Sequence, residues 1–350
     1  MKAQYEVNDS KISNKEKIAI VFLLIIIVVI IAFFSYKIIH GLSPKTVLPN
    51  NSLIISGYRN VNSLPIFGFR KMQYVFNIEK LKIIDFELPK DLGDTPEWSP
   101  DKKWIAFSNY ENLDESTDYF NNIYIISADG SKKILVPIQY GGTEPTWSPD
   151  SKQIAFYRSG WGSGIYIIDV SCLLQGESCI PKTRYLVKQH GHTRISSPTW
   201  SPDGKQIAYV GVNNNISVIN TDGTGLGYNL NPNYSGYISQ IRWSPRGDYI
   251  VGVCTEKPFY SLITNLCLVD INGTRITYLN TGYGTKYPKW SPDGQKIAYI
   301  LNTSNEPLSG SCWEGCPYPN SIFIINVDGT KNTRLTLQDN EFIQYFFWYP

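Results

Sequence analysis

Two histidines of this 350-residue chain have the spacing of a metal-binding pair. His190 and His192 stand two positions apart in QHGHTR, and in an extended strand this spacing places both imidazoles on one side. The only other histidine is His40, so any further metal ligands would be Asp, Glu or water. We therefore expect an exposed polar loop at this pair and no metal or other cofactor, with a two-histidine metal site as the weaker alternative.

The six cysteines form three pairs that are local in the sequence. Their spacings of 7, 13 and 4 residues do not make the paired CxxC signature of a zinc site, and no histidine adjoins them. An even number of cysteines is typical of disulfides in an exported domain, and reduced thiols are the alternative. Proximity predicts the pairs Cys172–Cys179, Cys254–Cys267 and Cys312–Cys316.

Signatures of other catalytic or nucleic-acid-binding sites are absent from the sequence. There is no G-x-S-x-G elbow with a downstream Asp and His, and no Walker or dinucleotide-binding glycine motif. Beyond residue 40 the 27 basic residues balance 27 acidic ones, whereas a nucleic-acid-binding domain normally carries a basic excess. We therefore expect no nucleic-acid partner.

A sequence phrase that occurs five times predicts the strands that would position any site. PTWSPDSKQIAFY, which begins at Pro145, has close relatives at Pro96, Pro198, Ile241 and Pro288. Its tryptophan recurs every 43 to 53 residues, a period typical of propeller blades. The tryptophans of the five copies are Trp98, Trp147, Trp200, Trp243 and Trp290.

Each repeat has the pattern of four short strands joined by tight turns. A strand ending in Trp leads through SPDG, or a variant, to strands such as KQIAYV and GIYIID, and a fourth strand follows. Pro sets φ in such a turn, Asp hydrogen-bonds to its own backbone and Gly accepts positive φ. Alternating β-branched and aromatic residues suit sheets that pack against one another. We interpret the Trp as a structural wedge between neighbouring blades.

The two ends of the chain each contain part of a sixth blade. Residues 53–56, 73–78 and 82–86 match the second, third and fourth strands of a repeat. The missing first strand is matched by IQYFFWYP at the other end, which contains Trp348. The sequence therefore predicts an all-β fold, a six-bladed β-propeller of four-stranded antiparallel blades, in which pairing of the two ends removes open sheet edges.

The phrase P-x-W-S-P-D-G-x-x-I-A-[FY] resembles the repeat of TolB-type β-propellers, which also occurs in the propeller domains of the prolyl oligopeptidase family. The resemblance covers residues 52–350 and implies the fold, whereas such repeats serve many functions. Arg246 replaces the turn Asp in one copy, and Lys102 and Ser151 replace the turn Gly in two others. We expect neither the small domain that precedes the TolB propeller nor the hydrolase domain that follows the prolyl oligopeptidase propeller.

The N-terminal region predicts a membrane anchor. Residues 18–34 are uninterrupted apolar residues, near the lower length limit for a spanning helix. The long polar segment before them, and the lack of a small-x-small cleavage site, favour a retained signal-anchor over a cleaved signal peptide. Lysines are more numerous before this segment than just after it, so the positive-inside rule places the N-terminus in the cytoplasm.

We therefore expect a single-pass protein of the cytoplasmic membrane with its propeller on the extracytoplasmic side. The expected parts are a cytoplasmic tail (1–17), a transmembrane signal-anchor helix (18–36), a linker (37–51) and the propeller (52–350).

Long links gather on one face of the expected propeller. Links from first to second and from third to fourth strands leave on one face, which we call the turn face; the other links leave on the long-loop face. Functional residues are often presented on loops over a rigid scaffold, and aromatic side chains dominate recognition sites. The candidate partner-binding residues on the long links are Trp161, Phe259, Tyr260, Trp313 and Tyr318, for which packing on the core is the alternative.

These features favour a non-enzymatic binding or scaffold module for a protein, peptide or glycan, through the long-loop face. The alternative function is a propeller enzyme, lyase-like or hydrolase-like, with its site at the channel mouth and a metal bound by His190 and His192.

Overall fold

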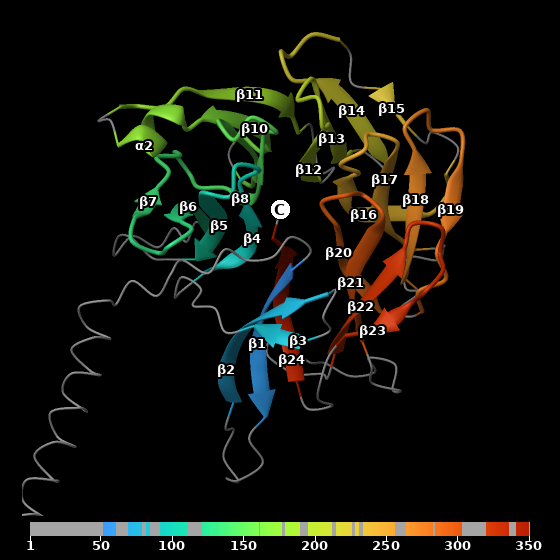
Figure 1. Ribbon diagram of the computed structural model, residues 1–350. Coiled ribbons are helices and arrows are strands. Elements are labelled where there is room, and N and C mark those ends of the chain that lie inside the picture. Colours follow the sequence, from blue (N-terminus) through green and yellow to red (C-terminus); the bar gives the residue numbers. More distant parts are fainter. Residues whose placement is uncertain are drawn as a thin grey trace, which may run out of the picture. The chain divides into compact units, whose positions relative to one another are not determined.

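Figure 1 shows the computed structural model of the protein. It describes residues 52–349 apart from 61–68, 79–81, 85–91, 111–120, 161, 177–178, 190–194, 212–214, 226–227, 231–233, 256–263, 283, 303–319 and 336–340. The expected tail, anchor and linker lie outside the described residues. No helix in the part of the chain that the structure describes has both the length and the apolar character required to cross a membrane.

Six four-stranded antiparallel sheets make up the fold, which confirms the predicted propeller. We number them as blades I to VI. Blade I contains, in order across the sheet, β24 (Glu341–Trp348), β1 (Ser52–Asn60), β2 (Phe69–Asn77) and β3 (Lys82–Ile84). Blade II contains β4 (Asp94–Trp98), β5 (Trp104–Tyr110), β6 (Asn121–Ser127) and β7 (Lys133–Leu135). Blade III contains β8 (Thr143–Trp147), β9 (Gln153–Arg158), β10 (Gly164–Asp169) and β11 (Thr183–Lys188).

The remaining blades repeat this order. Blade IV contains β12 (Ser196–Trp200), β13 (Gln206–Val210), β14 (Ile216–Asn220) and β15 (Tyr228–Asn229). Blade V contains β16 (Tyr237–Trp243), β17 (Tyr249–Thr255), β18 (Thr264–Asp270) and β19 (Ile276–Tyr278). Blade VI contains β20 (Thr285–Trp290), β21 (Lys296–Asn302), β22 (Asn320–Asn326) and β23 (Thr333–Arg334). A short helix, α2 (Ser171–Gln175), lies between β10 and β11.

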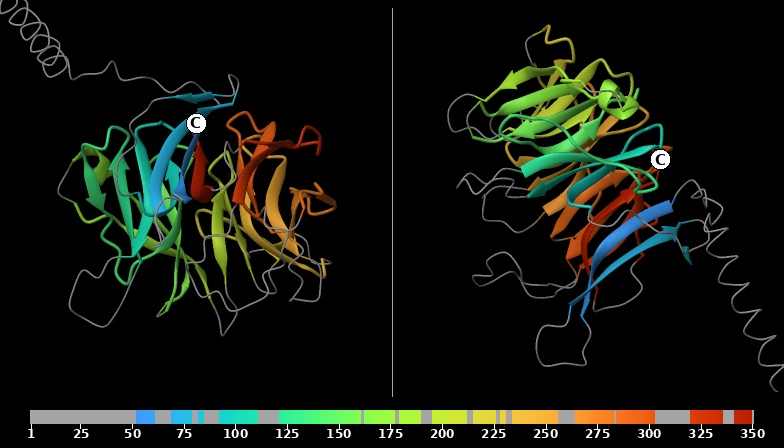
Figure 2. Two further views of the ribbon diagram at one scale, coloured as in Figure 1. Left: turned by 90° about the horizontal axis from the view of Figure 1, so that it is seen from below. Right: turned by 90° about the vertical axis from the view of Figure 1, so that its left-hand side faces the viewer.

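Blade I closes the ring by pairing the two ends of the propeller, as the sequence predicts. Strand β24 lies antiparallel to β1, with Trp348 opposite Leu53. The first strands of successive blades contact one another in the order β24, β4, β8, β12, β16 and β20, and β20 returns to β24. These six strands surround the axis in Figure 1, and the side views in Figure 2 show the sheets face to face around it. Because the ring is closed, every first strand has another first strand on each side.

Four of the six tryptophans that end the first strands join two blades by a hydrogen bond, which supports their role as wedges, whereas the Nε1 atoms of Trp98 and Trp243 have no hydrogen-bond partner among the described residues. The Nε1–H of Trp147 donates to the carbonyl oxygen of Glu97 at 3.1 Å, so each partner belongs to a different blade. The same bond is made by Trp200 to Thr146, by Trp290 to Arg242 and by Trp348 to Lys289. In every case the acceptor is the residue just before the tryptophan of the preceding blade. The wedge therefore sets the spacing between first strands.

The SPDG turn has the chemistry that the sequence predicts. In blade IV the Ser201 hydroxyl donates to Asp203 at 2.6 Å, and the Lys205 amide donates to the same carboxylate oxygen at 3.0 Å. These two bonds lower the pKa of Asp203. Gly204 has φ 72°, and the residues that replace it elsewhere keep this left-handed conformation, with Lys102 at 64° and Ser151 at 60°.

Blade V keeps the same turn with a rearranged carboxylate. Arg246 stands where the other copies have Asp, and the Ser244 hydroxyl donates instead to Asp248 at 2.7 Å. The acidic residue of this turn stands two positions later in the sequence than in the other copies, after Gly247, and its carboxylate still accepts the hydrogen bond of the serine hydroxyl. The departure noted in the sequence is therefore compensated locally.

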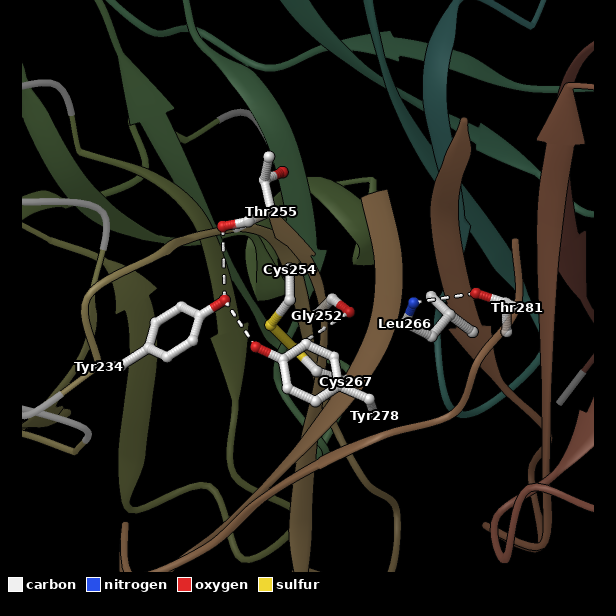
Figure 3. The surroundings of a disulfide bond; sticks show 8 residues. All are labelled: Tyr234, Gly252, Cys254, Thr255, Leu266, Cys267, Tyr278 and Thr281. Atoms are coloured by element: carbon white, nitrogen blue, oxygen red, sulfur yellow. Dashed lines mark hydrogen bonds between the residues drawn. A yellow bond between two sulfur atoms is a disulfide. The ribbon is translucent and has the colours of Figure 1, made fainter. Parts of the chain in front are cut away.

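Two of the three predicted disulfides are present, and the third pair, Cys312–Cys316, lies outside the described residues. Cys172 and Cys179, with Cα atoms 6.3 Å apart, tie α2 to the link that follows it. Cys254 and Cys267 join the neighbouring strands β17 and β18. In Figure 3, Tyr234 and Tyr278 lie beside this second bridge and their hydroxyls are 3.3 Å apart.

Candidate functional site

The residues that the sequence singles out for partner or metal binding fall in the undescribed links. All five aromatic candidates, Trp161, Phe259, Tyr260, Trp313 and Tyr318, lie outside the described residues, as do His190 and His192. Their roles therefore remain predictions. The candidate site has to be built from the described residues that flank these links and from the axis of the ring.

Exposed tyrosines lie at a link within blade II and at the link between blades II and III. Tyr110 ends β5, where the link to β6 begins, and its side chain is 57% exposed. Tyr140 lies in the link from β7 to β8 and is 47% exposed. Both positions belong to the long-loop face because second-to-third and fourth-to-first links leave there. Aromatic surface is therefore present on this face in the described part of the chain.

Arg158 braces the link that contains Trp161. This arginine ends β9, and its Nε and Nη2 donate to the Gly162 carbonyl at 3.3 and 3.1 Å. Its Nη1 donates to the Gln139 carbonyl at 3.4 Å, and its guanidinium lies 5.9 Å from the ring of Tyr140. One side chain thus ties the link after β9 to the link before β8.

Two tyrosine hydroxyls hold the same link from the other side. Tyr166 on β10 donates to the Gly162 carbonyl at 2.7 Å, and Tyr185 on β11 donates to the Ser163 carbonyl at 2.9 Å. Their rings meet edge to face with centroids 4.5 Å apart. Burial raises the pKa of both hydroxyls, with nearby Arg158 acting in the opposite direction, so both remain donors at neutral pH. We call Tyr140, Arg158, Tyr166 and Tyr185 the tyrosine–arginine patch.

The axis of the ring is a second place where unusual residues converge. The first strands of blades II to VI each contain a β-bulge before the tryptophan. Three residues before each tryptophan, a residue other than glycine has φ between 50° and 54°. A left-handed conformation costs such a residue about 1–2 kcal/mol and persists only where its surroundings hold it. These residues are Thr95, Glu144, Ser197, Gln240 and Tyr287.

Side chains at the bulges satisfy the backbone of the next blade. The Ser197 amide donates to the Glu144 carboxylate, and the Tyr287 amide donates to the Gln240 side-chain oxygen at 2.6 Å. In both pairs, donor and acceptor occupy the same position of neighbouring repeats. The bulges of blades III and IV, and those of blades V and VI, are therefore linked to each other as well as strained.

Charged side chains from different blades meet at the position just before the repeated tryptophan. Lys289 on β20 places Nζ 3.7 Å from Glu97 Oε2 on β4, and the Thr146 hydroxyl donates to Glu97 Oε1 at 2.9 Å. Blades VI and II lie on either side of blade I, so this ion pair passes across the closing blade. Burial and the charge of Arg242 lower the pKa of Lys289 to about 8, although Glu97 acts in the opposite direction.

A groove of about 570 Å³ opens elsewhere, between the outer parts of blades V and VI. Its apolar lining includes Leu268, Leu279 and Ile325, and its polar lining includes Arg275 and Asp328. The pKa of Asp328 is lowered by the Thr330 hydroxyl and amide, which is the chemistry of a hairpin turn. No predicted site residue lines this groove.

No group of three or more His, Cys, Asp or Glu side chains is arranged to hold a metal ion among the residues with described positions. The two histidines of the weaker metal hypothesis are not among them.

The axial charges are not among the predicted site residues, although the sequence contains a signal for them. Within the repeated phrase, the residue before Trp is the variable one: it is Glu97, Thr146, Thr199, Arg242, Lys289 and Phe347 in the six blades. Charged residues at a variable position within a repeated phrase could have indicated the charged cluster at the axis. The bracing of the Trp161 link by Arg158 had no such signal, because its partners come from three separate segments.

Comparison with known proteins supports the fold. No protein-family model matches the chain. TolB from Acinetobacter baumannii is 18% identical, with a TM-score of 0.62 over 90% of this chain and 70% of that chain. A protein assigned as TolB from Agrobacterium tumefaciens is also 18% identical, with a TM-score of 0.58 over 85% of this chain and 99% of that chain. These likenesses show a TolB-like six-bladed propeller.

A curated relative matches a shorter part of the chain. Dipeptidyl-peptidase 5 of Porphyromonas gingivalis is 27% identical over 120 residues, or 30% of this chain. The match spans 17% of the length of the peptidase. The activity of that enzyme is therefore not transferred to this chain.

Proposed function

We propose that this protein is a membrane-tethered, extracytoplasmic binding module that recognises a protein, peptide or glycan through its long-loop face. The observation that carries the proposal is the bracing of the link around Trp161. Arg158, Tyr166 and Tyr185 fix the carbonyls of Gly162 and Ser163, immediately after that tryptophan. A held loop loses less conformational entropy when it binds, so a partner gains affinity from contacts on it.

The composition of the tyrosine–arginine patch suits recognition. Tyrosine, tryptophan and arginine are enriched among the residues that contribute most to binding. Arg158 stacks on Tyr166 with its guanidinium 4.2 Å from the ring, and exposed Tyr140 extends the aromatic surface toward blade II. The patch therefore combines rigid apolar surface with oriented polar groups.

The disulfides support the proposed compartment. Cys172–Cys179 and Cys254–Cys267 are both bonded, and such bonds persist in oxidising environments outside the cytoplasm. Together with the transmembrane helix predicted at residues 18–36, they favour a propeller held outside the cytoplasmic membrane. Protease digestion of intact cells that express the full-length chain tests this: the propeller should be cleaved from outside, and protection until the membrane is broken would contradict it.

Binding is tested by presenting immobilised residues 49–350, which form one compact unit, to peptide and glycan arrays and to cell-envelope extracts. Trp161→Ala and Arg158→Ala should each weaken the binding of a captured partner by roughly thirtyfold, the effect of losing about 2 kcal/mol at a major contact. Direct titration of the captured partner supplies the dissociation constants.

The matched control is Ile180→Ala. Ile180 is 93% exposed and lies in the link from β10 to β11, on the turn face. It should bind the partner as the wild type does. Equal weakening by all three variants, or no weakening by any, would contradict recognition through the long-loop face.

A further inference from the structure

Three ionisable side chains meet at the axis from three blades, and their charges do not balance. Glu97, Arg242 and Lys289 are the residues before the tryptophans of β4, β16 and β20. Lys289 Nζ lies 3.7 Å from Glu97 Oε2. Lys289 and Arg242 stand on neighbouring strands joined by the bond from Trp290 to the Arg242 carbonyl, so their like charges repel. The cluster contains two cations and one carboxylate, at positions where the side chains of Lys289 and Glu97 are only 16% and 25% exposed. Buried charges normally have a partner of opposite sign.

The Arg242 guanidinium has a donor edge at Nε for which the described residues supply no acceptor. Its Nη1 donates to the Ile241 carbonyl at 2.7 Å. Its Nε is buried and has no hydrogen-bond partner among the described residues. A buried charged donor without an acceptor is costly, so its retention calls for an explanation. The edge formed by Nε and Nη2 is the one that arginine uses to bind a carboxylate with two parallel hydrogen bonds.

Glu97 does not supply that carboxylate. One of its oxygens accepts the Thr146 hydroxyl, and the other lies 3.7 Å from Lys289 Nζ, beyond ordinary hydrogen-bond length. Lys289 is thus only partly neutralised and feels the like charge of Arg242 from the adjacent blade. Burial, together with this like charge, lowers the pKa of Lys289 to about 8. An anion placed between Arg242 and Lys289 would remove this repulsion.

We propose that Arg242 and Lys289 form a binding site for a carboxylate at the axis of the propeller. The guanidinium supplies two parallel donors, and the ammonium supplies a third donor and a second positive charge. A bound carboxylate brings the cluster to two cations and two anions. The carboxylate belongs to a small organic acid or to the C-terminus of a short peptide, and both sources present the same group to the site.

Thermal unfolding of the full-length chain tests the site, because a ligand that binds the folded state raises the Tm. Sodium acetate is compared with acetamide, which has nearly the same shape and no charge, at pH 7 and constant ionic strength set with sodium chloride. Acetate should raise the Tm with a saturating dependence on concentration, and acetamide should not. N-acetyl-diglycine and its C-terminal amide form the peptide arm: a stronger response to the free acid than to acetate identifies a peptide carboxylate as the better ligand.

Variants assign the response to the two residues. Arg242→Gln and Lys289→Gln should each weaken the apparent affinity for acetate by about tenfold or more. Lys152→Gln, in an exposed turn of blade III, removes a positive charge elsewhere and should respond as the wild type does. Equal responses to acetate and acetamide, or an acetate response that survives in both axial variants, would overturn the proposal.

A second measurement needs no variant. The side-chain ammonium of Lys289 can be titrated by NMR in the wild-type protein with and without acetate. Acetate should raise the pKa of Lys289 from about 8, because the added negative charge stabilises the ammonium. An unchanged titration at acetate concentrations that raise the Tm would place the bound anion elsewhere and refute the site.

Discussion

At the residue scale, the repeated tryptophan phrase contains residues that the fold requires and one position, just before the tryptophan, whose side chain the fold does not restrict. Each described wedge bond runs from a tryptophan Nε1 to a backbone carbonyl, for example from Trp290 to Arg242 at 3.0 Å. Because any residue supplies a carbonyl, the side chain at that position is not restricted by the wedge. It is glutamate, threonine, arginine, lysine or phenylalanine in different blades. The repeated phrase therefore places different side chains at the axis without loss of the tryptophan contact in the four blades that make it.

Lys289 gives a prediction at this scale. Its folded pKa of about 8 lies below the 10.5 of the unfolded chain, so between these values the unfolded state binds more protons. Stability therefore rises with pH in that window. From pH 7 to pH 9.5 the free energy of unfolding of the wild type should gain at most about 2 kcal/mol relative to Lys289→Met. Urea unfolding of both proteins at the two pH values measures the difference.

Taking the difference between the two proteins removes the contributions of other groups that titrate in this range. The change with pH that remains therefore belongs to the Lys289 ammonium. A gap between the two proteins that stays constant or narrows with pH would contradict the assignment.

At the element scale, two pairs of bulged first strands are held together by a side chain of one strand and a backbone amide of the next. Glu144 and Gln240 occupy the same place in blades III and V, and each accepts the amide of the corresponding residue in the next blade. Strain of about 1–2 kcal/mol per left-handed residue is thereby offset by hydrogen bonds between blades. The first strands are thus linked by their bulges as well as by the tryptophans.

Glu144→Ala should destabilise the propeller by about 1–3 kcal/mol, because the Ser197 amide loses its acceptor. Glu144→Gln retains an acceptor of the kind that blade V already uses, and should lose less than half as much. Equilibrium unfolding in urea compares the variants. Equal losses for Ala and Gln would show that the carboxylate charge, and not the hydrogen bond, matters.

At the scale of the whole molecule, closure depends on one strand from the far end of the chain. Phe346 and Trp348 on β24 pack in a buried cluster with Leu53 of β1 and Ile300 of β21, so a single strand completes both blade I and its contact with blade VI. Removing β24 would open the sheet edge of β1 and expose this cluster. The ring is therefore one cooperative unit.

Deletion of residues 345–350 should abolish the cooperative thermal transition, since it removes four buried aromatic residues and four of the seven residue pairs between β24 and β1. Phe346→Ala, which keeps the strand, should cost about 3–5 kcal/mol. Ile180→Ala on the exposed turn face should change stability by less than about 0.5 kcal/mol. A truncated protein with an unaltered Tm would contradict closure by β24.

Much of the architecture was predictable from the sequence because its causes are local. Turn residues such as Asp203 and Gly204 act within a few positions of themselves, and the strand pattern repeats with the tryptophan. The composite blade followed from counting strands at both ends of the chain, and the two observed disulfides from proximity in the sequence. The long-loop aromatic residues, the anchor and its orientation are predictions from the sequence that the described residues do not test.

The sites were decided by tertiary structure. Glu97 and Lys289 are separated by more than half of the chain, and they meet because six first strands close around one axis. Arg158, Tyr166 and Tyr185 hold one link together because three neighbouring strands of blade III bring them to the same end of the sheet. Periodicity determines which strands form and how many blades they make. Which side chains meet depends on the bulged register of those strands and on closure of the ring, and neither leaves a local pattern in the sequence.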